Sequence, residues 1–153
     1  MRNICLILGP NLNMLGHREC EVYGSKTLDQ IKDFTIKKIS SNDVQLDWLQ
    51  SNSETEIINK IHECVRKNYD GLVINPGAFT HTSVAIHDAL KTFKNTVAEV
   101  HMSHVSSRES FRLTRLTSPA ASLIIEGLGY LVYYIGIISI LERINHGIPN
   151  NRS

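Results

Sequence analysis

The stretch GLVINPGAFTHTS, residues 71–83, decides the fold, because an apolar run ends abruptly in a polar loop. Gly71–Ile74 is typical of a buried strand, and residues 75–83 carry side chains that can bind a ligand. The same transition occurs at two other places, Asn3–Gly9 with loop 10–13 and Thr96–Val100 with loop 101–104. Parallel strands end at one edge of a sheet, where open α/β sheets bind ligands. Three polar loops at that edge predict a small-molecule site and favour an enzyme.

Strand-like and helix-like segments alternate outward from this stretch. Thr27 and Gln30 have capping-box spacing and precede apolar residues at helical spacing, so they predict the start of a helix. Ser53 and Glu56 predict a second helix in the same way. The remaining expected elements are a strand at Val44–Leu49, a helix from Thr80–Ser83 to Phe93, a loop or short helix at Ser106–Arg115, a strand near Ala121–Ile125 and a helix at Leu128–Leu141. Short connections between alternating elements predict an α/β fold with five parallel strands and helices on both faces.

Length and composition indicate a single catalytic domain, residues 1–153, whose polar end 145–153 we expect to be frayed. The 16 Lys and Arg residues nearly balance the 15 Asp and Glu residues, so we expect neither a nucleic-acid partner nor a membrane surface. Leu128–Leu141 is shorter than the roughly 20 residues of a transmembrane helix, so we expect a buried or oligomer-facing helix. The three cysteines, without a secretory segment at the N-terminus, are expected as reduced thiols in the cytoplasm.

The loop Pro10–Lys26 is far longer than the roughly 2–6 residues that usually connect a strand to a helix. Loops of this length in compact domains are usually binding loops or lids, so we expect a mobile lid. It carries Asn11, Arg18 and Tyr23. A guanidinium group favours the anion of a neighbouring phenol, so Tyr23 beside Arg18 is a candidate general base.

Glu99 and His101 lie two residues apart on an expected strand and therefore share one face. A carboxylate in this position can orient the imidazole and favour its protonated form, which a general acid needs. The alternative is a surface glutamate beside a histidine that only caps the strand. Arginines occur in the expected loops, at Arg18, Arg108, Arg112 and Arg115. They either bind a substrate carboxylate or form an ordinary solvated basic face.

Common cofactor motifs are absent from the sequence. Asn75-Pro76-Gly77 predicts a sharp turn, but no GxGxxG or GxxxxGK[ST] pattern accompanies it, so nucleotide binding is not supported. His81 and His87, like His101 and His104, lack the spacing of a helical metal-binding pair and have no cysteine cluster nearby. Metal binding is therefore the less favoured interpretation of these histidines.

The motifs GPNLNMLGHRE (9–19), Tyr23-Gly24, QSNSE (50–54), INPGAFTHTSVAIHDAL (74–90), EVHMS (99–103), Arg108-Glu109 and Phe111-Arg112 resemble those of the type II 3-dehydroquinate dehydratases in order and spacing. The resemblance implies a flavodoxin-like three-layer sandwich with a five-stranded parallel sheet. It also implies a dodecamer built from trimers that needs no metal or cofactor. The implied reaction is dehydration of 3-dehydroquinate to 3-dehydroshikimate, by anti elimination through an enolate.

The resemblance assigns catalytic roles by position. Tyr23 would take the C2 proton of 3-dehydroquinate, with Arg18 holding it as a phenolate. Asn11 would position a water that stabilises the enolate developing at C3. His101, oriented by Glu99, would protonate the departing C1 hydroxyl. The implied substrate-binding residues are Asn75, His81 and Arg112 for ring hydroxyls, the backbone N–H groups of Met102 and Ser103 for the carboxylate, Arg108, and Asp88, which would reach into a neighbouring subunit's site.

The departures from the family pattern lie outside these catalytic positions. They are His104 for the usual Asn, Cys20 for Pro, Arg115 for a small hydroxyl residue, and Leu123 and Val132 for glycines. The alternatives to catalysis are a non-catalytic binding module of the same fold and a phosphate or flavin binder. Retention of Tyr23, Arg18 and His101 argues against the first. The first loop lacks a hydroxyl-rich phosphate cradle, which argues against the second.

Overall fold

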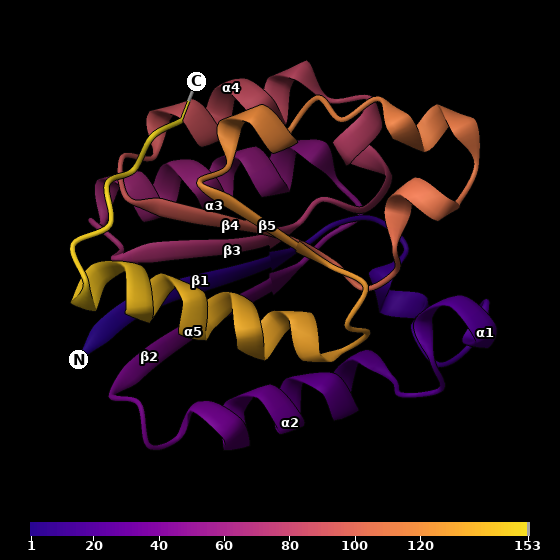
Figure 1. Cartoon of the computed structure of the whole chain (residues 1–153), viewed down its shortest axis with the longest axis horizontal. Coiled ribbons are helices and arrows are strands. Elements are labelled where there is room, and N and C mark those ends of the chain that lie inside the picture. The colour runs from indigo at the N-terminus through magenta and orange to yellow at the C-terminus, as the bar shows by residue number, and fades with distance from the viewer. Residues whose placement is uncertain (153) are drawn as a thin grey trace.

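A five-stranded parallel sheet lies at the centre of the structure, a computed structural model that describes residues 1–152 (Figure 1). Its strands are β1 (Arg2–Leu8), β2 (Val44–Gln50), β3 (Gly71–Asn75), β4 (Thr96–His101) and β5 (Leu123–Glu126). They lie in the order β2-β1-β3-β4-β5. β2 and β3 lie on opposite sides of β1, so the direction of strand addition reverses there, and ligands of such sheets bind at this switch point.

Helices cover both faces of the sheet and make three layers (Figure 1). They are α2 (Leu28–Ile39) and α5 (Leu131–Asn145) on one face, and α3 (Glu54–Arg66) and α4 (Val84–Thr92) on the other. Successive side chains of a strand point to opposite faces. Ile4 and Leu6 of β1 therefore pack with α2 and α5, whereas Cys5 and Ile7 pack with α3 and α4. The predicted α/β sandwich with five parallel strands is confirmed.

The last helix begins later than predicted. Gly127 and Gly129 have φ angles of 86° and 58°, so the chain turns there, and α5 starts at Leu131 instead of Leu128. The buried residues of α5 are Val132, Tyr133, Gly136, Ile137, Ile140 and Leu141. We expected this helix to be either buried or facing another subunit, and within the chain it is buried against the sheet. No helix within residues 1–152 is long and apolar enough to cross a membrane.

One of the two predicted capping boxes is complete. Thr27 Oγ1 accepts a hydrogen bond from the Gln30 amide at 3.3 Å, and the Thr27 amide donates to Gln30 Oε1 at 3.0 Å. At α3, Ser53 caps the Glu56 amide at 3.3 Å, but the Glu56 carboxylate accepts from the Ser51 hydroxyl instead of returning to Ser53. The second box is therefore only half formed, because Ser51 competes for the carboxylate.

The connections contain several short helices, of which the sequence predicted only the one within Ser106–Arg115, where η4 (Ser110–Leu113) lies. Pro10–Lys26 contains the 3-10 turn η1 (Leu12–Met14) and the helix α1 (Cys20–Tyr23), so Cys20 opens a helix instead of lying in an irregular loop. The other 3-10 turns are η2 (Gly77–His81) after β3, and η3 (Val105–Ser107), η4 (Ser110–Leu113) and η5 (Ser118–Ala120) between β4 and β5.

The C-terminal segment is held by hydrogen bonds as far as Arg152, the last residue that the structure describes, whereas we expected residues 145–153 to be frayed. Asn150 Nδ2 donates to the Lys94 and Asn95 carbonyls at 2.7 and 2.9 Å. Arg152 Nη1 donates to the Leu90 carbonyl at 3.2 Å. The last carbonyls of a helix lack partners within the helix, and Arg152 supplies a donor at the end of α4.

Candidate active site

A cleft of about 640 Å³, measured to its open mouth, lies beyond the carboxyl ends of β1, β3 and β4. It is lined by most of the predicted site residues: Asn11, Arg18, Tyr23, Asn75, His81, His101, Met102, Ser103, Arg108 and Arg112. The prediction that three polar loops meet at this edge is confirmed. Glu99 lies behind His101, and Asp88 is exposed on α4 away from the cleft lining.

The loops after β1 and β3 fit closely together at the floor of the cleft. The Gly9 amide donates to the Asn75 carbonyl at 2.8 Å, and a Cβ on Gly9 would lie 2.4 Å from the Pro76 carbonyl oxygen. Asn75 Oδ1 accepts from the Gly77 amide at 3.1 Å, while Asn75 Nδ2 donates to the buried Tyr133 hydroxyl at 2.9 Å. The Asn75 amide is therefore fixed in orientation, with one N–H left for a ligand.

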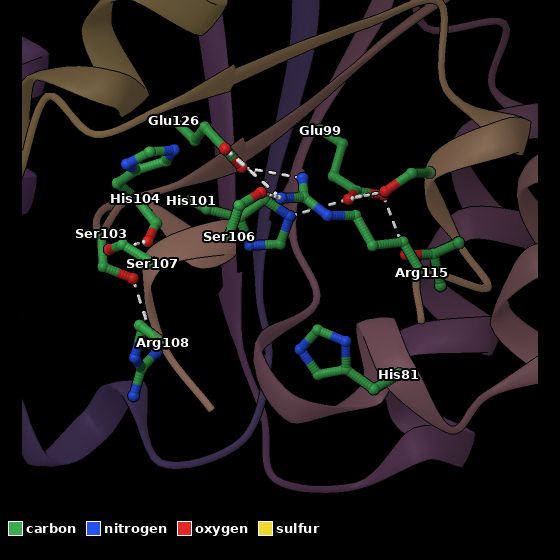
Figure 2. Close-up of polar contacts among 12 residues, drawn as sticks. His81, Glu99, His101, Ser103, His104, Ser106, Ser107, Arg108, Arg115 and Glu126 are labelled. Carbon is green, nitrogen blue, oxygen red and sulfur yellow. Dashed lines mark hydrogen bonds and ion pairs between the residues drawn. The ribbon is translucent and has the colours of Figure 1, made fainter. Parts of the chain in front are cut away.

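His101 is held by a fully buried carboxylate (Figure 2). His101 Nε2 lies 2.7 Å from Glu99 Oε1, and the Thr117 and Ser118 hydroxyls donate to Glu99 at 2.8 and 2.5 Å. Burial by itself would raise the pKa of Glu99, but the hydrogen bond and charge of His101, with those of the two hydroxyls, hold that pKa below its usual value. Glu99 is thus an acceptor, so His101 Nε2 carries a hydrogen and Nδ1 remains for a ligand.

Two arginines lie beside Tyr23. The guanidinium carbons of Arg18 and Arg108 are each 5.3 Å from the centre of the Tyr23 ring. Arg18 is also paired with Glu19 at 3.0 Å, and Arg108 donates to Ser103 Oγ at 3.4 Å. The sequence predicted Arg18 as the partner of Tyr23, but it placed Arg108 only among the substrate-binding residues.

The surroundings of His81 favour its neutral form, which can accept a hydrogen bond. Burial lowers its pKa below the usual value, and the positive charges of Arg112, His101 and Arg115 act in the same direction. His81 Nδ1 lies 2.6 Å from the Thr114 carbonyl oxygen and must donate to it, which leaves Nε2 as the acceptor.

Sequence reasoning missed three residues that support the site. Thr117 and Ser118 hold Glu99, and Tyr133 of α5 holds Asn75. No spacing rule connects a hydroxyl near residue 117 with a carboxylate on β4, because the intervening chain is irregular. Arg115, by contrast, was expected at the active edge, but its guanidinium is paired with Glu126 behind the residues that line the cleft.

Comparison with known proteins identifies the family. Residues 2–141 match the family model described as dehydroquinase class II. A 3-dehydroquinate dehydratase of Helicobacter acinonychis (strain Sheeba) is 46% identical over 141 residues, which cover 91% of this chain and 84% of that protein. The chain belongs to the class II dehydroquinases. The corresponding protein of Helicobacter hepaticus is 43% identical over 142 residues, with coverage of 93% and 90%.

Solved structures of class II dehydroquinases share the fold. The type II dehydroquinase from Butyrivibrio crossotus DSM 2876 superposes with a TM-score of 0.89 at 39% identity, and the match covers 92% of this chain and 97% of that one. The enzyme from Propionibacterium acnes gives a TM-score of 0.89 at 31% identity. The predicted flavodoxin-like architecture is therefore that of this family of hydro-lyases.

Proposed function

We propose that this chain removes water from 3-dehydroquinate to give 3-dehydroshikimate, by anti elimination through an enolate. One observation carries the proposal: a single cleft holds a tyrosine beside two arginines and a histidine bound to a buried carboxylate. Removal of a proton next to a carbonyl needs a base, a stabiliser of the enolate and an acid for the leaving group. The relatives described as 3-dehydroquinate dehydratases support the choice of substrate.

In this proposal Tyr23 is the base. Its phenolate takes the C2 proton, and the C–H electron pair passes to the C3 carbonyl as an enolate. The positive charges of Arg18 and Arg108 lie beside the ring, where they can attract the negative charge that the oxygen carries as base. Asn11 lines the same cleft, where its amide can hold a water against the enolate oxygen.

His101 is the acid in the second half of the reaction. The enolate re-forms the carbonyl, a C1–C2 double bond forms, and the C1–O bond breaks. The Nδ1 proton of His101 moves to the departing oxygen, which leaves as water. Glu99, held as a carboxylate by its hydrogen bonds, stabilises the imidazolium before the transfer and fixes the ring.

Polar groups around the cleft would hold the substrate. His81 Nε2 can accept from a ring hydroxyl, because Nδ1 is occupied by the Thr114 carbonyl. The free N–H of Asn75 and the guanidinium of Arg112 can bind further hydroxyls. The backbone N–H groups of Met102 and Ser103 are assigned to the carboxylate.

The direct test is to follow the enone absorbance of the product with purified protein and 3-dehydroquinate, with and without a chelator. We expect turnover in both cases. His101→Ala should stop release of water while C2 proton exchange with solvent continues, because the base is intact. A wild-type protein that gives no enone under either condition would rule out the proposed function.

We further propose a cytoplasmic homo-oligomer, a dodecamer built from trimers. Asp88 is exposed on α4 and away from the cleft of its own chain, which suits a residue that completes a neighbouring site. Cys5, Cys20 and Cys64 are all free thiols, as in a reducing compartment.

A further inference from the structure

A bidentate ion pair involves Glu126, the register neighbour of His101, and lies outside the cleft lining. Arg115 Nη1 and Nη2 lie 2.7 and 3.3 Å from the two carboxylate oxygens of Glu126, and Arg115 Nη2 also donates to Ser106 Oγ at 3.1 Å (Figure 2). Only 19% of the Arg115 side chain and 21% of the Glu126 side chain are exposed. Bidentate, partly buried geometry makes such a pair stronger and more directional than an ordinary surface pair.

Arg115 belongs to a short segment, Thr114–Ser118, that we call the support segment because it holds groups on both sides of the cleft. The Thr114 carbonyl fixes His81 at 2.6 Å. The Thr117 and Ser118 hydroxyls fix Glu99. A displacement of the support segment would therefore move a substrate-binding residue and the partner of the acid together.

Glu126 belongs to the strand beside the acid. It is the register partner of His101 between β4 and β5, and the next residue, Gly127, donates its amide to the His101 carbonyl at 3.2 Å. Register partners in a parallel sheet project from the same face. The Arg115–Glu126 pair thus ties the support segment to the strand that neighbours His101.

The pair also sets the local charge. Arg115 is one of three cationic neighbours that disfavour the protonated form of His81. The other charged or titratable groups around the site are Glu99 on β4, His104 after β4, Tyr23, Arg18 and Arg108 with their shared partner Glu19, and Arg112 with its partner Glu109. Because Glu126 balances Arg115, removal of either residue alone leaves an uncompensated charge beside this group of residues.

We propose that Arg115 and Glu126 are positioning residues for the reaction proposed above: their ion pair holds the support segment against β5 and keeps the charge near His101 and His81 balanced. The inference rests on the proposed function. It concerns residues that do not line the cleft and to which the resemblance assigned no role.

The test compares Arg115→Gln, Glu126→Gln, the double variant and Arg115→Lys with the wild type. Each single Gln variant should lower kcat/KM about 10-fold, because small misplacements of catalytic groups cost rate steeply. Arg115→Gln removes a positive charge and should shift both limbs of the pH profile of kcat/KM to higher pH by about 0.5 unit. Glu126→Gln removes a negative charge and should shift both limbs to lower pH. In the double variant both charges are gone, so its pH profile should return to that of the wild type while its kcat/KM stays low. Arg115→Lys keeps the positive charge but cannot form the bidentate contact, so its pH profile should match the wild type while its kcat/KM falls.

Arg2→Gln is the matched control, because Arg2 forms a 2.9 Å ion pair with Asp70 at the opposite end of the sheet. It should leave rate and pH profile unchanged, and circular dichroism should report folded protein for every variant. Normal kcat/KM and an unmoved pH profile in both Gln variants, with an active wild type, would overturn the inference. Misfolding would change the pH profiles of Arg115→Gln and Glu126→Gln in the same direction, whereas shifts in opposite directions support the inference. An inactive wild type is a different result, which removes the proposed function itself.

Discussion

The hydroxyl of Tyr23 is the part of that side chain on which the proposed proton transfer depends. Tyr23→Phe keeps the ring beside the same arginines and removes the ionisable oxygen. We expect kcat to fall by about 10²–10⁴, with a far smaller change in KM, because general-base catalysis supplies a term of this size. Steady-state kinetics measure both constants. Tyr134→Phe on α5 is the control, because Tyr134 does not line the cleft, and it should leave kcat and KM unchanged. Near-normal turnover of Tyr23→Phe would assign the base elsewhere.

Glu99 links the chemistry to stability. Its folded pKa lies below the unfolded value of about 4.3, so its stabilising contribution is complete above that pH and is lost as the pH falls through the folded pKa. Glu99→Gln should lower the free energy of unfolding by about 3 kcal/mol at pH 7, because an amide cannot accept from His101, Thr117 and Ser118 together.

Urea unfolding of wild type and Glu99→Gln at one protein concentration, from pH 7 to pH 3, measures this difference. It should shrink as the pH falls below about 4.3, where the carboxyl group of the unfolded chain takes up a proton, and disappear below the folded pKa. Glu142→Gln, a change at an exposed carboxylate on α5, should show a small difference at all pH values. A difference for Glu99→Gln that grows toward low pH would contradict the sign expected for a carboxyl group whose pKa is lowered by folding.

At the scale of elements, the loop Pro10–Lys26, which we expect to act as a lid, has a first half anchored in the core and a more exposed second half. Leu12 and Leu15 are 7% and 1% exposed and hold its first half in the core, whereas α1 contributes no buried residue. Segments with few buried contacts open at low free-energy cost. We therefore expect amides of residues 16–26 to exchange at least about 10-fold more slowly when 3-dehydroshikimate is bound, with residues 10–15 and α3 unchanged. Equal exchange of residues 16–26 with and without ligand would refute a closing lid.

The sequence predicts a contact well when its residues lie in a regular strand or helix, and poorly when they lie in an irregular connection. The Glu99–His101 contact follows from the two-residue period of β4, and the sheet follows from alternating apolar runs. The contacts of Thr117 with Glu99 and of Arg115 with Glu126 arise from an irregular connection, whose path no local periodicity sets. The half-formed box at Ser53 shows the same limit, since a third side chain competes for the predicted partner.

At the scale of the whole molecule, the proposed assembly makes the active site depend on two chains. Asp88 lies outside the cleft of its own chain, whereas His101 lines it. If Asp88 completes a neighbouring site, Asp88→Ala should lower kcat/KM about 10-fold although every group in its own cleft is intact, a cost typical of a lost charged contact. His101→Ala should abolish turnover by the loss of the acid.

Mixing the two impaired proteins separates this assembly from a purely local effect. After dissociation and reassembly together, some sites combine an intact His101 with an intact Asp88 from the neighbouring chain, so activity should rise above that of either variant alone. Assembly of one variant with itself is the matched control and should restore nothing, and light scattering should report an oligomer throughout. A fully active monomer, or mixed oligomers no more active than their parents, would contradict a shared site. Complementation requires that the two residues serve one site from different chains, because two lesions in one chain's own cleft could not be repaired by a neighbour.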